Sequence, residues 1–207
     1  MAALAEPKPK PKAYVIPWTC AATAHTFASY QRSAKTLEIL WLLGASVNKR
    51  AAAAHVIPLW KPTYPPLVVY TTTPLTGVKE VANVTVHVTD LSDADRHEAQ
   101  AYYGCHMIAS AAEALGVSAH EGQAAGAFLI GNALPAYVEA FADCPVYLMP
   151  AALEPYKGGV KDTFAALTTE ALDAAVAALN AQIHLSRPAE CAEERKRIFI
   201  SDATWTF

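Results

Sequence analysis

The chain has few charged side chains. They make up 17% of its 207 residues, against roughly 25% in an ordinary soluble domain. No lysine or arginine occurs between Arg96 and Lys157. Because nucleic-acid binding depends on basic side chains that neutralise phosphates, this central stretch is unsuited to it, and no DNA partner is expected. The basic residues nearer the two ends are interpreted as solvated side chains.

Recognisable site motifs are also absent. The cysteines form no C-x-x-C pair, and no two histidines lie three or four residues apart, the spacing that builds a metal-binding helix face. There is no G-x-x-x-x-G-K-[ST] phosphate loop, and no serine has a G-x-S-x-G context. Gly122 and Gly126 do not follow a predicted strand, as a dinucleotide fingerprint would require. The sequence therefore assigns no catalytic, cofactor-binding or metal-binding residue, and no cofactor.

Apolar runs long enough to cross a membrane are missing as well. The longest uncharged run near the middle, 122–138, contains polar residues, glycines and a proline, so no transmembrane segment is predicted. The N-terminus lacks the apolar core of a secretory signal, and an intracellular location with reduced thiols is expected. The sequence leaves open whether a disulfide joins any of the four cysteines, Cys20, Cys105, Cys144 and Cys191.

What the chain does have is alanine, together with a proline-rich start. Alternating Pro and Lys over residues 6–12 predict an extended arm spanning 1–18. The rest, 19–207, is interpreted as a single globular domain with a Pro-rich break near 58–66.

Apolar residues spaced three and four apart predict most of the domain to be helical. Gly116 is interpreted as a helix stop, and Ser118 to Glu121 as a capping box that starts the next helix. Gly122, Gly126 and Gly131 are interpreted as close-packing positions in that helix. The other predicted helices cover 23–45, 48–56, 92–115, 135–142 and 168–185.

Two short segments have the alternating or β-branched pattern of strands, 67–73 and 84–89, and the turn at 73–77 predicts that they form a hairpin. A third apolar segment, 146–149, is predicted to be an edge strand. The predicted fold class is α+β and mainly α-helical, with Ala-rich helices packed around a small central β-hairpin and an extended N-terminal arm.

The favoured function is a non-catalytic structural or accessory subunit of a large assembly. The low charge, the small neutral faces of helix 168–185 and the aromatic residues near both ends, Trp18, Trp205 and Phe207, indicate surfaces covered by partners. Other protein subunits would bind through the arm, the Ala-rich helices and the aromatic C-terminus. The composition resembles accessory subunits of organellar energy-converting complexes, which makes a mitochondrial location possible. A viral coat subunit is the first alternative, and a lipid- or pigment-binding module is another.

A small helical enzyme, with a pocket near Cys105, His106 and His120, is the remaining alternative. The stretch from Cys105-His106-Met107 to Glu121 resembles the AhpD-like and carboxymuconolactone decarboxylase families, with a likeness that runs to roughly Phe141. The resemblance implies a helical Cys/His site, although the paired cysteines of the peroxidase branch are missing. On a helix, neighbours point about 100° apart, so Cys105 and His106 would not share one position, and Cys105 is interpreted as a buried apolar residue.

Overall fold

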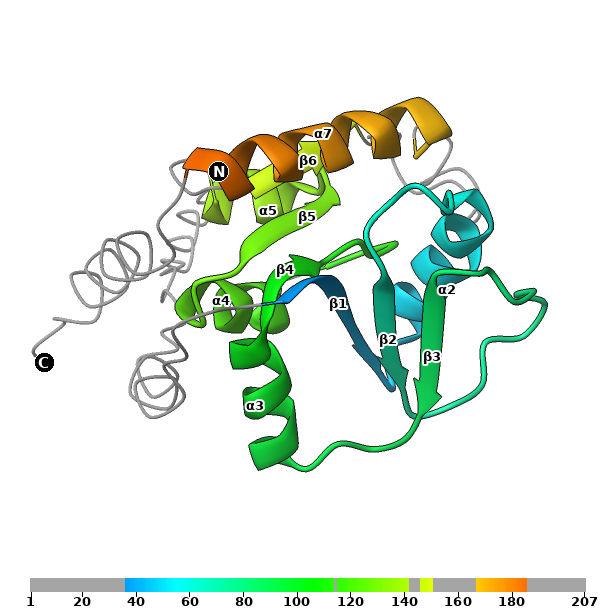
Figure 1. Ribbon diagram of the computed structural model, residues 1–207. Helices are drawn as coiled ribbons and strands as arrows, with labels where there is room; N and C mark the ends of the chain where they lie inside the picture. Colours follow the sequence, from blue (N-terminus) through cyan, green and yellow to red (C-terminus); the bar gives the residue numbers. More distant parts are fainter. Residues whose placement is uncertain (1–35, 114, 142–145, 151–166, 186–207) are drawn as a thin grey trace, which may run out of the picture.

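The computed structural model describes residues 36–113, 115–141, 146–150 and 167–185, and these are organised around one parallel β-sheet (Figure 1). Six strands pair in the order β3-β2-β1-β4-β5-β6, and every pairing is parallel. The strands are β1 (Thr36–Gly44), β2 (Leu67–Thr71), β3 (Val84–Val88), β4 (Tyr103–Met107), β5 (Phe128–Asn132) and β6 (Val146–Met149).

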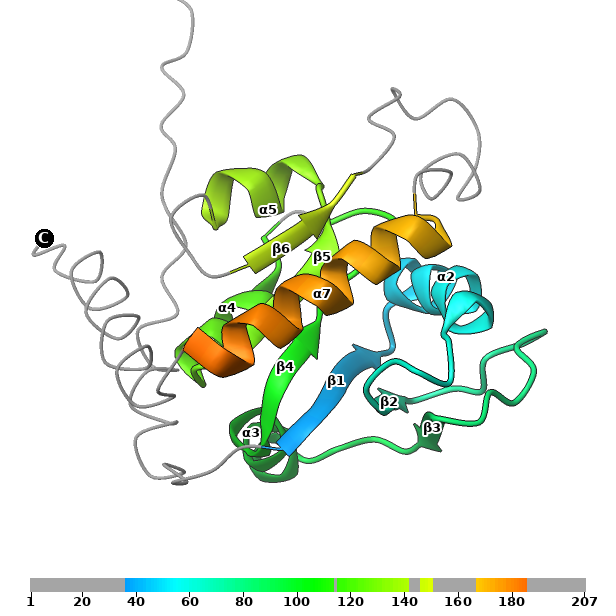
Figure 2. The same ribbon diagram turned by 45° about the horizontal axis from the view of Figure 1, so that its top comes forward.

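Helices cover both faces of the sheet, which makes the architecture a three-layer, doubly wound α/β fold. One face carries α2, η1 and α7, and the other carries α3, α4 and α5 (Figures 1 and 2). Their bounds are α2 (Val47–Val56), the short 3-10 helix η1 (Ile57–Leu59), α3 (Asp93–Tyr102), α4 (Val117–Ala124), α5 (Pro135–Ala140) and α7 (Thr169–Leu185).

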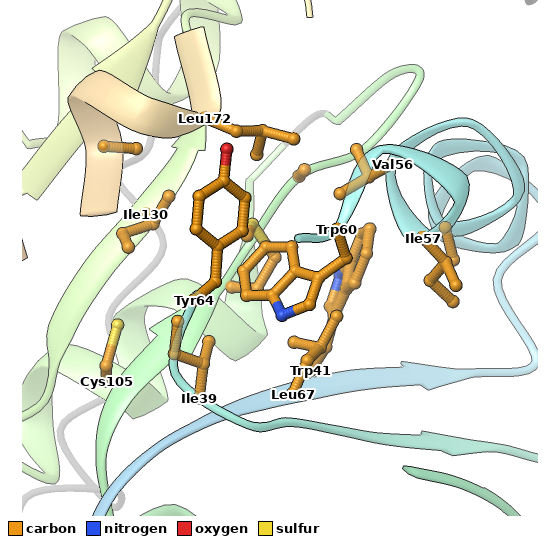
Figure 3. Close-up of a cluster of buried hydrophobic side chains, with 14 of the residues drawn as sticks. Ile39, Trp41, Val56, Ile57, Trp60, Tyr64, Leu67, Cys105, Ile130 and Leu172 are labelled. Carbon is orange, nitrogen blue, oxygen red and sulfur yellow. The ribbon is translucent and has the colours of Figure 1, made fainter. Parts of the chain in front are cut away.

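The larger hydrophobic core lies between the sheet and the α2–α7 layer. Trp41 and Ile39 of β1 are fully buried there, and Leu40 between them points to the opposite face. Figure 3 shows Trp41 and Trp60 packed beside Tyr64, with Leu172 of α7 closing the cluster. A smaller core lies under α4 and α5 and consists of Ile108, Ala119, Leu129, Leu134, Tyr137 and Phe141.

The predicted fold class is wrong, because the sheet is the framework of the fold and its strands are parallel. The predicted helix 23–45 contains β1, and the predicted helix 92–115 ends at Tyr102, after which β4 begins. Strands buried on both faces are apolar along their whole length, and such runs also satisfy the spacing of a helix. The two strands predicted as a hairpin are β2 and β3, which lie side by side but run in the same direction.

Other elements are confirmed. Helices α2, α5 and α7 match the segments predicted for them, and β6 lies at an end of the sheet as an edge strand. The Pro-rich stretch 58–66 connects α2 to β2. The predicted arm 1–18 and the C-terminal aromatics lie outside the described residues. Within the described part of the chain, none of the helices is both long and apolar enough to span a bilayer.

Candidate functional site

The strand order reverses direction between β1 and β4. From β1 the chain passes through α2 to β2, which lies next to β1 in the sheet. From β4 it passes through α4 to β5, on the opposite side of the β1–β4 pair, and α4 covers the opposite face of the sheet from α2. The connections therefore leave the carboxyl ends of β1 and β4 in opposite directions, and the crevice between them is where open α/β sheets bind ligands. Polar groups at this edge are therefore candidates for a binding site.

The start of α2 forms one wall of the crevice. Ser46 caps the helix, with its hydroxyl oxygen accepting a hydrogen bond from the Lys49 backbone N–H at 3.3 Å. The cap places Lys49 in the first helical turn, directly after β1. Free N–H groups in a first turn and the helix dipole both favour an anion.

The start of α4 forms the opposite wall, and Lys49 joins the two. The Lys49 ammonium donates to the Ser118 hydroxyl at 2.6 Å. The pKa of Lys49 lies below that of an ordinary lysine because burial disfavours its charged form. The carboxylates of Glu113 and Glu121 oppose that shift, and Arg96 adds to it. Two cations and two carboxylates are therefore close enough at this edge to act on one another.

Glu121 is the most buried of these charges, with 6% of its surface exposed. It accepts a hydrogen bond from the Gln100 amide at 2.9 Å, and its other oxygen lies 3.8 Å from the Arg96 guanidinium. The His106 ring donates from Nε2 to the Gln100 carbonyl at 3.1 Å. Gly122 makes room for that ring, because a Cβ there would lie 2.4 Å from His106 Nδ1. The carboxylate is thus held by two side chains of α3, and His106 of β4 in turn holds the Gln100 backbone.

The loop between β4 and α4 is fixed by hydrogen bonds across the carboxyl edge. Asn132, which ends β5, accepts from the Ser110 backbone N–H at 3.0 Å and donates to the Ser110 carbonyl at 2.8 Å. The Tyr137 hydroxyl donates to the Ile108 carbonyl at 2.8 Å. Both Asn132 and Tyr137 are fully buried, so this loop is a firm support for Glu113 and Ser118.

Gly116 gives the same loop its sharp turn into α4. Its φ of 68° lies in the left-handed region, and a Cβ there would lie 2.6 Å from the Tyr137 ring. The sequence pattern assigned Gly116 to the end of a helix, but it is the residue that caps the start of α4.

The residues of the predicted Cys/His pocket do not come together. Cys105 and His106 are successive residues of β4 and therefore point to opposite faces of the sheet. Cys105 is buried in the larger core, and burial raises the pKa of its thiol. His120 lies on α4, with its ring 4.9 Å from that of Phe141, and burial lowers its pKa. Across the described residues, no group of three or more His, Cys, Asp or Glu side chains could hold a metal ion.

Sequence reasoning missed the residues that do converge, Lys49, Arg96, Glu113, Ser118 and Glu121. They come from three elements and one loop, and only the parallel order of the strands brings them to one edge. One signal was available, since Ser46 and Ser110 each follow the end of an apolar strand, which is where polar site residues of parallel sheets lie.

No family model and no curated protein matches the chain. Among solved structures, it is similar to the crystal structure of the GtfA/B complex, with 17% identity, a TM-score of 0.45, and coverage of 82% of this chain and 36% of that one. It is also similar to the apo structure of OtsA, with 13% identity, a TM-score of 0.45, and coverage of 86% and 45%. The chain spans less than half the length of either of these two structures.

The prediction of a structural or accessory subunit is wrong, and so are the viral coat and Cys/His enzyme alternatives. The first two required a mainly helical chain with surplus apolar faces, but the described residues form a doubly wound parallel sheet with helices on both faces. Helix α7 buries Leu172, Ala175, Val176 and Leu179 against that sheet. The Cys/His family requires a helix at 103–107, which is β4. The mitochondrial location was inferred from the subunit interpretation and is unsupported.

Proposed function

We propose that this chain is an enzyme domain that binds a nucleotide-activated sugar in the crevice between β1 and β4 and supports transfer of that sugar. The observation that carries the proposal is the Lys49–Ser118 contact between two helix N-termini, with Glu113 and Glu121 beside it. Both walls of the crevice start at the carboxyl edge of a sheet in the strand order 3-2-1-4-5-6, the order of nucleotide-binding folds.

Lys49 and the N-termini of α2 and α4 are the basis for the phosphate part of the proposed ligand. A diphosphate needs positive charge and hydrogen-bond donors, and Lys49, Ser118 and the first-turn N–H groups of α2 and α4 supply both. Lys49 is partly desolvated, and a charge there interacts more strongly with an anion than it would in water.

The carboxylates beside Lys49 are the basis for the sugar part of the proposed ligand. Glu121 is buried and already paired with Gln100 and Arg96. A crevice built for phosphate alone would not gain from the less buried Glu113, because its carboxylate repels an anion. Carboxylates do accept hydrogen bonds from the hydroxyl groups of ribose and of sugars. A ligand with both anionic phosphates and many hydroxyls uses all of these groups, and a nucleoside diphosphate sugar is such a ligand.

The chemistry that this arrangement would assist is displacement at the sugar's anomeric carbon. An acceptor hydroxyl forms the new C–O bond, the bond from that carbon to the diphosphate breaks, and its electron pair stays on the diphosphate oxygen. The hydroxyl proton passes to the leaving diphosphate. Charge grows on the diphosphate during this step, and Lys49 with the helix N-termini would stabilise it.

The test is direct binding. The protein is titrated by calorimetry with UDP, GDP and ADP and with the glucose ester of each, and at least one pair should show saturable binding. The Lys49→Met variant removes the ammonium and keeps the apolar stem, so the nucleotide that binds should lose at least about tenfold in affinity, as expected for a charge-assisted contact.

The matched control is Lys79→Met, which removes an exposed lysine from the connection between β2 and β3. It should bind like the unmodified protein. If no nucleotide saturates, or if the two variants behave alike while both remain folded by circular dichroism, the proposal fails.

A further inference from the structure

Strand β3 forms an open edge of the sheet (Figure 1). At its two ends the bonds to β2 go through odd-numbered residues, since the Asn83 carbonyl accepts from the Leu67 N–H at 2.9 Å and the Thr89 N–H donates to the Thr71 carbonyl at 2.8 Å. Backbone groups of successive strand residues alternate between the two sides of a strand. The backbone groups of 84, 86 and 88 therefore point away from β2, where no strand in the described part of the chain pairs with β3.

A groove of about 700 Å³ follows this open edge. The side chains of Val84, Val86 and Val88 line it, and so does Thr85, whose side chain lies on the opposite face of the strand. The groove therefore includes the edge of β3 itself and not only one of its faces. Its other wall is the connection 72–83, which contains no helix and contributes apolar side chains, among them Leu75, Val78 and Val81.

Strand β3 lacks the features that usually protect an edge from pairing. Such features are a charged residue or proline in the strand, or a bulge that twists the edge away. Strand β6, at the other end of the sheet, is flanked by Pro145 and Pro150. Strand β3 contains neither charge nor proline, and it pairs with β2 without a register shift. With Val86 38% and Val88 52% exposed, this edge is a template for another strand.

The sequence of β3 indicates which strand that is. Val-Thr-Val-His-Val has its valines arranged symmetrically about Val86. If a second copy of β3 runs antiparallel with the two Val86 residues opposite each other, each Val84 lies opposite a Val88 and each Thr85 opposite a His87. All the valines then lie on the groove side, and the two Val86 residues exchange N–H to C=O bonds. A contact between identical surfaces about a twofold axis needs such a self-complementary pattern.

The charges beside the edge also suit a second copy. The groove carries Lys79 and Glu80, one cation and one anion, and both are exposed. A surface that has both signs side by side is complementary to itself, because each charge can face the opposite charge of the other copy. A groove of one sign would repel its own copy and favour an oppositely charged partner.

We propose that β3 is the dimer interface of this protein and pairs antiparallel with β3 of a second copy, so that the two sheets continue into one another. The inference does not rest on the proposed function, because β2 separates this edge from the crevice between β1 and β4.

The test is the mass of the full chain in solution. Sedimentation across a dilution series should show reversible association to twice the chain mass of 22.1 kDa. Val86→Lys places two positive charges next to each other at the twofold axis and should raise the dimer dissociation constant at least about a hundredfold. Val86→Glu should do the same with two negative charges. A mixture of the two variants should dimerise again, because opposite charges then meet at the axis.

Val138→Lys is the matched control, because Val138 is 49% exposed but lies on α5. It should dimerise like the unmodified protein, and circular dichroism checks that every variant is folded. The inference is overturned if the unmodified chain stays monomeric, which would mean that the edge is open or covered by its own chain, or if it grows beyond a dimer. It is also overturned if Val86→Lys associates as tightly as the unmodified protein, or if the mixed variants stay monomeric. A failure of the proposed function would leave the dimer unchanged.

Discussion

The centre of the sheet and its β3 edge differ in almost every physical respect. Strand β1 has a paired strand on each side and helices on both faces, and Ile39, Leu40 and Trp41 are fully buried. Strand β3 pairs only with β2 among the described residues, and Val86 and Val88 are 38% and 52% exposed. The connection from β2 to β3 has no described helix to cover it.

This difference explains where the candidate site lies. A crevice can hold a partly buried lysine and a buried glutamate only where the surrounding backbone is fixed, and the central strands provide that. The polar groups of the site are all attached to elements that follow or flank β1 and β4. The β3 edge carries no comparable cluster of charges among the described residues.

The largest expected effect is a loss of stability when a buried side chain at the centre of the sheet is truncated to alanine. The same truncation at the β3 edge should have a much smaller effect. Trp41→Ala removes a fully buried ring between β1 and the α2–α7 layer and should lower the free energy of unfolding by about 3–5 kcal/mol. Val86→Ala at the edge should cost under about 1 kcal/mol. Urea denaturation of both variants measures this, and similar losses would mean that the edge is as constrained as the centre.

The same contrast explains which strands the sequence could reveal. In β3, Val84, Val86 and Val88 alternate with polar residues, and this alternation predicted the strand correctly, although Val86 and Val88 are themselves exposed. Residues 37–43 of β1 are nearly all apolar because both faces are covered, and apolar residues of β1 also fall at helical spacing. A short apolar run of this kind does not distinguish a buried strand from a helix by periodicity.

Strand direction was a second limit. A short Pro/Gly turn within 73–77 suggested a hairpin, but the chain uses residues 72–83 to return to the starting end of the sheet. Nothing local distinguishes these two paths, since both begin with a turn. The order of strands is set by packing among distant segments, and the site depends on that order. Lys49 and Ser118 are 69 residues apart in sequence, and their contact could not be read from motifs.

The second prediction concerns packing beneath the site. Gly122→Ala should lower the free energy of unfolding by about 1–3 kcal/mol through overpacking, although alanine is the better helix former. The reason is that the added Cβ would lie 2.4 Å from His106 Nδ1 and 3.1 Å from Leu129. Denaturation of Gly122→Ala, His106→Ala and the double variant should show strong coupling. Additive effects would mean that the ring does not limit this position.

The third prediction is a pH effect on ligand affinity. Because burial lowers the pKa of Lys49, the ammonium loses its proton at a lower pH than an ordinary lysine does. Nucleotide affinity should therefore fall as pH rises through that lowered pKa, below the value of about 10.4 of a free lysine. Calorimetric titrations at rising pH measure this. The Lys49→Arg variant keeps its positive charge at high pH, so its remaining nucleotide affinity should not fall as the pH rises. If the affinity of this variant falls equally, a group other than Lys49 causes the pH dependence.

The smallest effect is expected at the surface, where α7 meets the connection between η1 and β2. Asp173 accepts hydrogen bonds from Lys61 at 2.6 and 2.7 Å and from the Tyr64 hydroxyl at 2.7 Å. These bonds, that of Lys61 first, lower the pKa of Asp173 below that of an ordinary carboxyl group. A carboxyl whose folded-state pKa is depressed adds stability above its unfolded pKa of about 3.9, and that stability is lost as pH falls through the folded pKa.

Asp173→Asn should therefore melt slightly below the unmodified protein at pH 7, and the gap should close in acid. Melting temperatures of both proteins, measured by calorimetry at pH 7 and at a pH below the folded-state pKa of Asp173, give this difference. Solvent screens the pair, because the two side chains are 40% and 49% exposed. The effect should therefore be much smaller than that of Trp41→Ala. A gap that stays constant with pH would show that the contribution of Asp173 does not depend on its charge.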